Sequence, residues 1–350
     1  MNWLLVFVPV AIALHYLLPG HGALVFAAAC LAIVPLAAWL GRATEHLAER
    51  TSEAMGGLLN ATFGNAAELI IGLMAISRGL YGIAKASITG SIIGNLLLVF
   101  GASAAAGGAR YKQQKFNAFM ARTQATLLIL AAIALLAPAV FQQIAGVKAR
   151  SSEVNLSLAI AIVLLIIYGL NLLFSLRTHR QLYAAEPAKP VEEPARSWPV
   201  GVSLAVLAGA TVLTAWISEI LVDSVNEAAA HFGMSDLFIG VVVIAIIGNA
   251  AEHSACIVAA LKDRMDLAIS ISIGSSIQIA LLVAPLLVIA SYFIGPRPMD
   301  LLFTLPEVMA VAVAVAITAQ IAGDGETHWL EGAQLLAVYV ILGSVFYYLP

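Results

Sequence analysis

The chain has 350 residues, of which 61% are hydrophobic and 11% are charged, and its mean hydropathy is +0.97. Because a soluble domain carries about 25% charged residues, this composition excludes a soluble globular protein and indicates a polytopic membrane protein. The net charge of −3 gives no indication that the chain binds nucleic acid.

A helix needs about 20 apolar residues to cross the hydrocarbon core of a bilayer. The chain has eleven segments of this kind, so we expect an all-α fold with about eleven transmembrane helices. In chain order their approximate bounds are 2–18, 22–40, 56–76, 86–106, 119–141, 153–176, 199–220, 235–260, 267–291, 301–322 and 331–349. No Lys or Arg precedes the first segment, which favours a retained helix over a cleaved signal peptide.

The segment after the second expected span carries Glu45, Glu49 and Glu53. Charges at this spacing are typical of a solvated or interfacial helix. The alternative is that Glu45 lies at the cytoplasmic mouth of an ion path and attracts cations.

The third expected span contains the pentapeptide GNAAE, with Asn65 and Glu68 three residues apart on one helical face. A carboxylate is costly in the core of a bilayer and usually marks the path of a polar species; the alternative is a protonated carboxyl group kept for packing. The fourth span adds Ser91 and Asn95. We expect Asn95 to line a site, whereas Ser91 can equally serve as a polar contact between helices.

The segment 177–198 is the one clear linker, because it contains three prolines, mixed charges and no apolar run. We expect it to be exposed and poorly ordered. The seventh span then ends near Glu219, Asp223 and Glu227, which either attract cations on the outer side or belong to a solvated helix end.

The eighth expected span repeats GNAAE with Asn249 and Glu252, and the ninth adds Ser275, Ser276 and Gln278. Gln278 is expected to line the site, and the two serines have the same two alternatives as Ser91. Glycine and alanine around both glutamates let helices approach closely, and glycine permits a helix to bend.

Three further residue types receive secondary interpretations. His253 is a packed neutral histidine or, alternatively, a proton relay. Glu307 follows a proline near a helix start, where the helix dipole favours its charge. Cys30 and Cys256 lack the spacing of metal ligands and are interpreted as small packing residues.

The two copies of GNAAE are 184 residues apart, and the Gly-Ser pair of the next span recurs at the same offset, Gly90-Ser91 with Gly274-Ser275. Each half then has five helices, and an odd number makes the halves enter the membrane from opposite sides, as in inverted-repeat transporters. The expected division is an N-terminal helix at 1–20, a first repeat at 21–176, a linker at 177–198 and a second repeat at 199–350.

Two glutamates and neighbouring amide oxygens form an all-oxygen set that suits a hard cation such as Ca²⁺. The sequence shows no His/Cys cluster for a transition metal, and neither an HExxH motif nor a nucleophile–base set for an enzyme. A cation channel with two acidic rings is an alternative to a transporter.

Lys and Arg residues are distributed unequally between the loops. The side of the N-terminus and the 177–198 linker carries twelve, and the other side carries five. The positive-inside rule therefore predicts a cytoplasmic N-terminus and linker and an external C-terminus.

The segments GNAAELIIG, GSIIGNLLLVFG, GNAAEHSACIVAA and GSSIQIALLVAP resemble the paired signature helices of the Ca²⁺/H⁺ antiporters, the cation/proton exchanger family of the calcium/cation antiporter superfamily. The resemblance covers most of the chain. It implies that Glu68 and Glu252 bind the ion and carry protons, and that the neighbouring amides are Asn65, Asn249 and Gln278. Ca²⁺ and H⁺ are then the substrates and no cofactor is needed; the expected location is a bacterial cytoplasmic membrane.

Two features qualify the resemblance. The Na⁺-coupled relatives place proline and hydroxyl residues beside the acidic ligand, whereas alanines fill those positions here, which favours protons as the counter-ion. Na⁺-coupled Ca²⁺ exchange and Na⁺(K⁺)/H⁺ exchange are the alternatives. Some members carry an acidic regulatory helix between the halves, but here prolines interrupt the three glutamates of the linker, so regulation by Ca²⁺ is not expected.

Overall fold

A computed structural model describes residues 2–18, 20–51, 53–145, 150–183 and 198–349. Short 3₁₀ or π-helical stretches are labelled η. The first half contains η1 (Asn2–Val6), α1 (Phe7–Leu17), α2 (Gly22–Ala48), α3 (Glu53–Phe63), α4 (Ala66–Ser77), α5 (Tyr81–Ile93), η2 (Gly94–Val99), α6 (Phe100–Arg110), α7 (Ala118–Ala145), α8 (Arg150–Leu173), η4 (Phe174–Thr178) and α9 (Arg180–Tyr183).

The second half contains α10 (Val200–Phe232), α11 (Asp236–Phe238), η5 (Ile239–Ile244), α12 (Ala245–Gly248), α13 (Ala250–Leu261), α14 (Met265–Gln278), η6 (Ile279–Val283), α15 (Ala284–Ile294), α16 (Leu305–Asp324) and α17 (Trp329–Tyr348). Two short antiparallel strands, β1 (Gln114–Lys115) and β2 (Glu326–Thr327), join the halves with Gln114 opposite Thr327. The all-α membrane fold is confirmed.

Eight described helices are long and apolar enough to cross a membrane, and there are nine if the bent segment from α11 to α13 counts as one. Two shorter apolar helices, Asn2–Leu17 and Ala66–Ser77, lie where two more spans are expected. The number eleven stays a prediction.

Several helices extend past their predicted ends. α2 continues to Ala48 and α10 to Phe232, so Glu45 and Glu219 lie within these helices, because polar residues with good helix propensity continue a helix beyond its apolar part. The start of the linker is helical as far as Tyr183. The rest of the linker, 184–197, lies outside the described residues.

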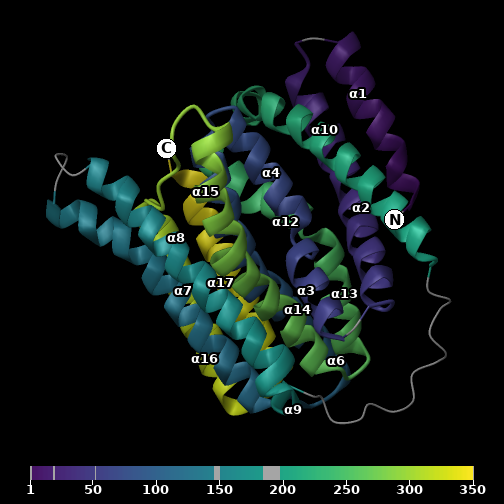
Figure 1. Cartoon of the computed structure of the whole chain (residues 1–350), viewed down its shortest axis with the longest axis vertical. Coiled ribbons are helices and arrows are strands. Elements are labelled where there is room, and N and C mark those ends of the chain that lie inside the picture. Colours follow the sequence, from purple (N-terminus) through teal and green to yellow (C-terminus); the bar gives the residue numbers. More distant parts are fainter. Residues whose placement is uncertain (1, 19, 52, 146–149, 184–197, 350) are drawn as a thin grey trace.

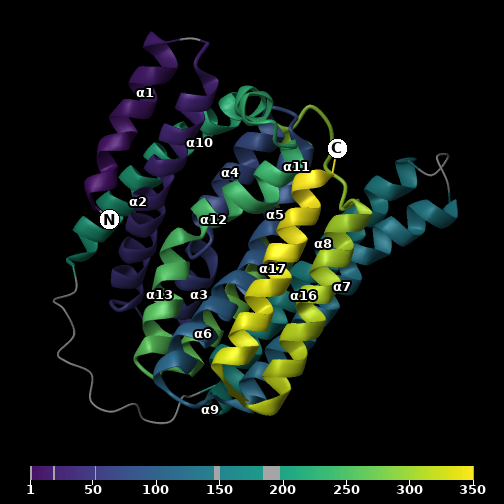
Figure 2. The same ribbon diagram turned by 180° about the vertical axis from the view of Figure 1, so that it is seen from behind.

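The helices flank a central group of broken and bent segments (Figures 1 and 2). α1, α2 and α10 pack together on one flank, and α7 packs against α16 on the other. Between them lie α3 to α6 and α12 to α15. The helix bounds recur at an offset of 184 residues: α4 with α13, α5 with its counterpart in α14, and α6 with α15.

The contacts between elements also occur in equivalent pairs. α8 packs on α15 and η6, and α17 packs on α6 and η2. In the same way α4 contacts α10 and α15, while α13 contacts α2 and α6. The two halves therefore enclose a common centre with approximate two-fold symmetry.

Candidate ion-binding site

A break in the helix precedes each motif glutamate. α3 ends at Phe63 and α4 begins at Ala66, and Asn65 between them has φ −105° and ψ 31°. Asn249 interrupts α12 and α13 in the same way, with φ −92° and ψ 8°, and the segments on its two sides are bent by 60°. The predicted bend is thereby confirmed in the second half. It leaves Glu68 and Glu252 in the first turn of α4 and α13.

The two broken segments run in opposite directions. In both views of the molecule α4 lies above its break and α13 lies below its break (Figures 1 and 2). The two glutamates thus lie near the middle, and the helices that carry them lead toward opposite ends of the protein.

A chain of hydrogen bonds connects the polar residues of the two halves. Asn65 donates through Nδ2 to Oε1 of Gln278 at 2.6 Å. Ser275 donates to Oδ1 of Asn65 at 2.8 Å, and Asn95 donates through Nδ2 to Oγ of Ser275 at 3.0 Å. Four predicted ligands therefore form one network across the halves.

The second asparagine makes a parallel contact. Asn249 donates through Nδ2 to Oγ of Ser91 at 3.0 Å and to the carbonyl of Ala245 at 2.9 Å. Both asparagines, like both glutamate-bearing helices, thus contact the polar helix of the opposite half.

The glutamates lie beside this network. Glu68 is 7% exposed, and a Cβ added to Gly248 would lie 3.0 Å from its Oε1. Its charge acts on Glu252, which is half-buried. The structure therefore brings all eight predicted site residues together, and their role as ligands stays a prediction.

Three acceptor oxygens at this centre have no hydrogen-bond donor among the described residues. They are Oδ1 of Asn95, Oδ1 of Asn249 and Oε2 of Glu252, and all three atoms are buried. A buried acceptor without a donor costs about 1–3 kcal/mol. A cation that accepts oxygen ligands would satisfy them, and no group of three or more His, Cys, Asp or Glu in the described ranges offers an alternative metal site.

Some candidate residues have other partners. Ser276 donates to the carbonyl of Ser272 within its own helix. Glu307 is 2% exposed and forms a capping box with Thr304, as its position at a helix start predicts, and it also accepts from Thr89 at 3.2 Å. His253 is half-buried.

The acidic residues of α10 are engaged as well. Glu219 and Asp223 pair with Arg78 at 2.5 and 3.0 Å, and Glu227 accepts from the backbone N–H of Gly22 at 2.8 Å. Glu45 is exposed at the end of α2. Cys30 and Cys256 are buried free thiols, as expected of packing residues.

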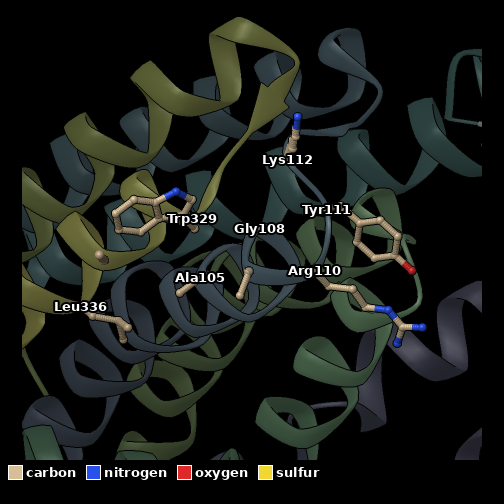
Figure 3. A pocket seen from close by; sticks show the side chains of 9 residues that line it. Ala105, Gly108, Arg110, Tyr111, Lys112, Trp329 and Leu336 are labelled. Atoms are coloured by element: carbon tan, nitrogen blue, oxygen red, sulfur yellow. The ribbon is translucent and has the colours of Figure 1, made fainter.

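A surface pocket of about 560 Å³ lies elsewhere, between the end of α6 and the start of α17 (Figure 3). Trp329 and Leu336 line one side and Lys112 the other. It shares no residue with the eight predicted ligands, and the basic side chains at its rim do not favour a cation.

A family model matches two segments of the chain. The model describes the sodium/calcium exchanger protein family, and it matches residues 21–177 and 202–348. One relative, the Ca(2+)/H(+) antiporter ChaA of Bacillus subtilis (strain 168), is 48% identical over 329 residues, which are 93% of each chain. The vacuolar calcium ion transporter of Schizosaccharomyces pombe (strain 972) is 40% identical over all of this chain and 85% of its own.

Solved structures agree with these matches. The structure of native YfkE has a TM-score of 0.85 at 43% identity, with 99% of both chains covered, and a second YfkE structure is described as that of a Ca²⁺/H⁺ antiporter protein. The H⁺/Ca²⁺ exchanger CAX shares the fold, with a TM-score of 0.74 at 15% identity.

Proposed function

The chain belongs to the sodium/calcium exchanger protein family, and from this premise we propose that it exchanges cytoplasmic Ca²⁺ for external H⁺ by alternating access. The relatives named as Ca²⁺/H⁺ antiporters support this choice of ions. It is a transporter and not an enzyme. The observation that carries the proposal is the cluster of three unsatisfied buried oxygens beside two interacting carboxyl groups.

Glu68 and Glu252 share the cation and the protons. When the site faces the cytoplasm, both carboxylates are ionised and bind Ca²⁺ together with amide oxygens. Without a cation two nearby carboxylates repel each other, so the pair takes up protons when it faces a more acidic exterior. Ca²⁺ is then released.

Exchange follows from the charge of the site. With Ca²⁺ or with two protons the pair is neutral, whereas the empty site carries two negative charges that are costly in a low-dielectric interior. The empty site therefore does not cross between the two sides, which couples the two fluxes.

Asn95, Asn249 and Gln278 supply neutral oxygen ligands, and Asn65, Ser91 and Ser275 position them. The hydrogen bonds described above support this division, because Asn65 and Ser275 already have partners for their oxygens. We further propose the predicted division into two repeats, which the two separate family matches support.

Transport in proteoliposomes tests the proposal. Glu68→Gln and Glu252→Gln should each abolish Ca²⁺ uptake driven by a pH gradient, because an amide does not carry the proton. Asp324→Asn, which removes an exposed carboxylate, is the matched control and should transport normally. Wild-type exchange by either site variant would refute the assignment of the site.

The same vesicles separate the other candidate functions. Uptake driven by a Na⁺ gradient at constant pH would identify a Na⁺-coupled exchanger. Flux that persists without any counter-gradient would identify a channel.

A further inference from the structure

The two ends of the molecule differ in how tightly they are closed. Ile71 lies one turn beyond Glu68 on the same face of α4 and is 1% exposed. Its counterpart 184 residues later is Ala255, one turn beyond Glu252 on α13, and this residue is exposed. The face of α13 next to the site is therefore open, and the equivalent face of α4 is closed.

Helix packing shows the same asymmetry. α5 packs closely on η5, so that a Cβ added to Gly90 would lie 2.1 Å from the carbonyl oxygen of Val241. At the equivalent Gly274 of α14 an added Cβ meets nothing within 4 Å. The opening thus lies on the side of α3 and α13.

An ion-pair cluster joins the helices on the closed side. Arg78 follows the last residue of α4 and contacts Glu219 at 2.5 Å and Asp223 at 3.0 Å, both on α10. It ties the end of a glutamate-bearing helix to the long helix that covers it.

The open side carries the same residue types at equivalent positions. Lys262 follows α13 as Arg78 follows α4, 184 residues earlier. Glu45 and Glu49 at the end of α2 have the four-residue spacing of Glu219 and Asp223 on α10. In the part of the chain that the structure describes, Lys262 makes no ion pair, and Glu49 contacts His46 instead at 3.4 Å.

We propose that Arg78 with Glu219 and Asp223 is a latch that closes the site on one side of the membrane, and that Lys262 with Glu45 and Glu49 is the equivalent latch of the opposite state. The inference rests on the proposed alternating access. In each half-cycle one latch forms as the other separates, because inverted repeats exchange their two arrangements.

Accessibility of single cysteines tests the latch. Ile71→Cys and Ala255→Cys, each without Cys30 and Cys256, are labelled in nanodiscs with a membrane-impermeant maleimide. In the parent protein Ala255→Cys should react faster. Adding Arg78→Gln should raise the rate at Ile71→Cys relative to that at Ala255→Cys by about threefold to tenfold, since exposed ion pairs contribute modestly.

Three further variants complete the test. Lys262→Gln should lower the same ratio or leave Ala255→Cys dominant, and it should slow exchange. Arg264→Gln removes a charge two residues away and should leave labelling at parent values. The exchanged pair Arg78→Glu with Glu219→Arg should restore the parent ratio, which a merely unfolded protein would not do.

Unchanged labelling in Arg78→Gln would overturn the latch, as would equal effects of Arg264→Gln and Lys262→Gln. The labelling needs no ion flux. Ca²⁺/H⁺ exchange by the parent protein with unchanged labelling would therefore refute the latch alone, whereas absence of exchange would refute the proposed function.

Discussion

Each glutamate depends on small neighbours from the opposite half. Gly248 leaves room for the carboxylate of Glu68, and Gly64 lies near Oε1 of Gln278, where an added Cβ would be 3.4 Å away. At these positions glycine serves close approach to a polar ligand and not backbone freedom.

Gly248→Ala should therefore weaken Ca²⁺ binding without loss of the fold. The added methyl group would lie 3.0 Å from Oε1 of Glu68 and displace the carboxylate by a few tenths of an ångström. We expect the Ca²⁺ concentration for half-maximal transport to rise by about threefold to tenfold, on the order of 1 kcal/mol. Gly94→Ala, where an added Cβ meets nothing within 4 Å, is the control, and equal transport by both variants would contradict the prediction.

The elements that carry the site depart from regular helices. Asn65 and Asn249 break two helices, and the π-helical stretches η2 and η6 interrupt two others next to the polar residues. Such π-helical turns frequently occur at functional sites. The irregular segments are buried in protein, where their backbone groups find partners other than lipid.

Equivalent glycines on α5 and α14 should respond differently to substitution. Gly90→Ala forces a Cβ onto the backbone of Val241 and should destabilise the protein by about 1–3 kcal/mol. The thermal midpoint in detergent should fall clearly below that of Gly82→Ala, whose added Cβ meets nothing within 4 Å.

Gly274→Ala should leave the thermal midpoint unchanged but slow exchange. Its Cβ is tolerated in the described state, whereas the opposite state is expected to bring α3 onto α14 as η5 now packs on α5. The ratio of transport rate to wild type measures this effect. A large fall in the midpoint, or full transport, would argue against an exchange of the two arrangements.

The whole molecule is two inverted halves that share one site, so protons and Ca²⁺ compete for the same two carboxylates. Apparent Ca²⁺ affinity should fall as the pH is lowered, by at most about 100-fold per pH unit where two protons are displaced. Binding of Ca²⁺ to purified protein at several pH values measures the slope. A slope of zero would show that the protons bind elsewhere.

Orientation is a second property of the whole molecule. The predicted topology puts Lys112 in the cytoplasm and Pro296 outside, and both residues are exposed. In intact cells an impermeant maleimide should label Pro296→Cys and not Lys112→Cys. The reverse pattern would invert the predicted direction of exchange.

The sequence by itself determined the membrane class, the repeat and the eight residues of the candidate site. These follow from composition and from costly polar groups in apolar segments, which are local properties. It did not determine the lengths of α2 and α10, because polar residues continue a helix past its apolar part.

Only the tertiary structure showed which oxygens lack donors, and that Arg78 is paired whereas Lys262 is not. Both facts depend on which surfaces of the two halves meet in this state. A repeated sequence encodes both arrangements equally, and only packing across the halves decides which side of the molecule is closed.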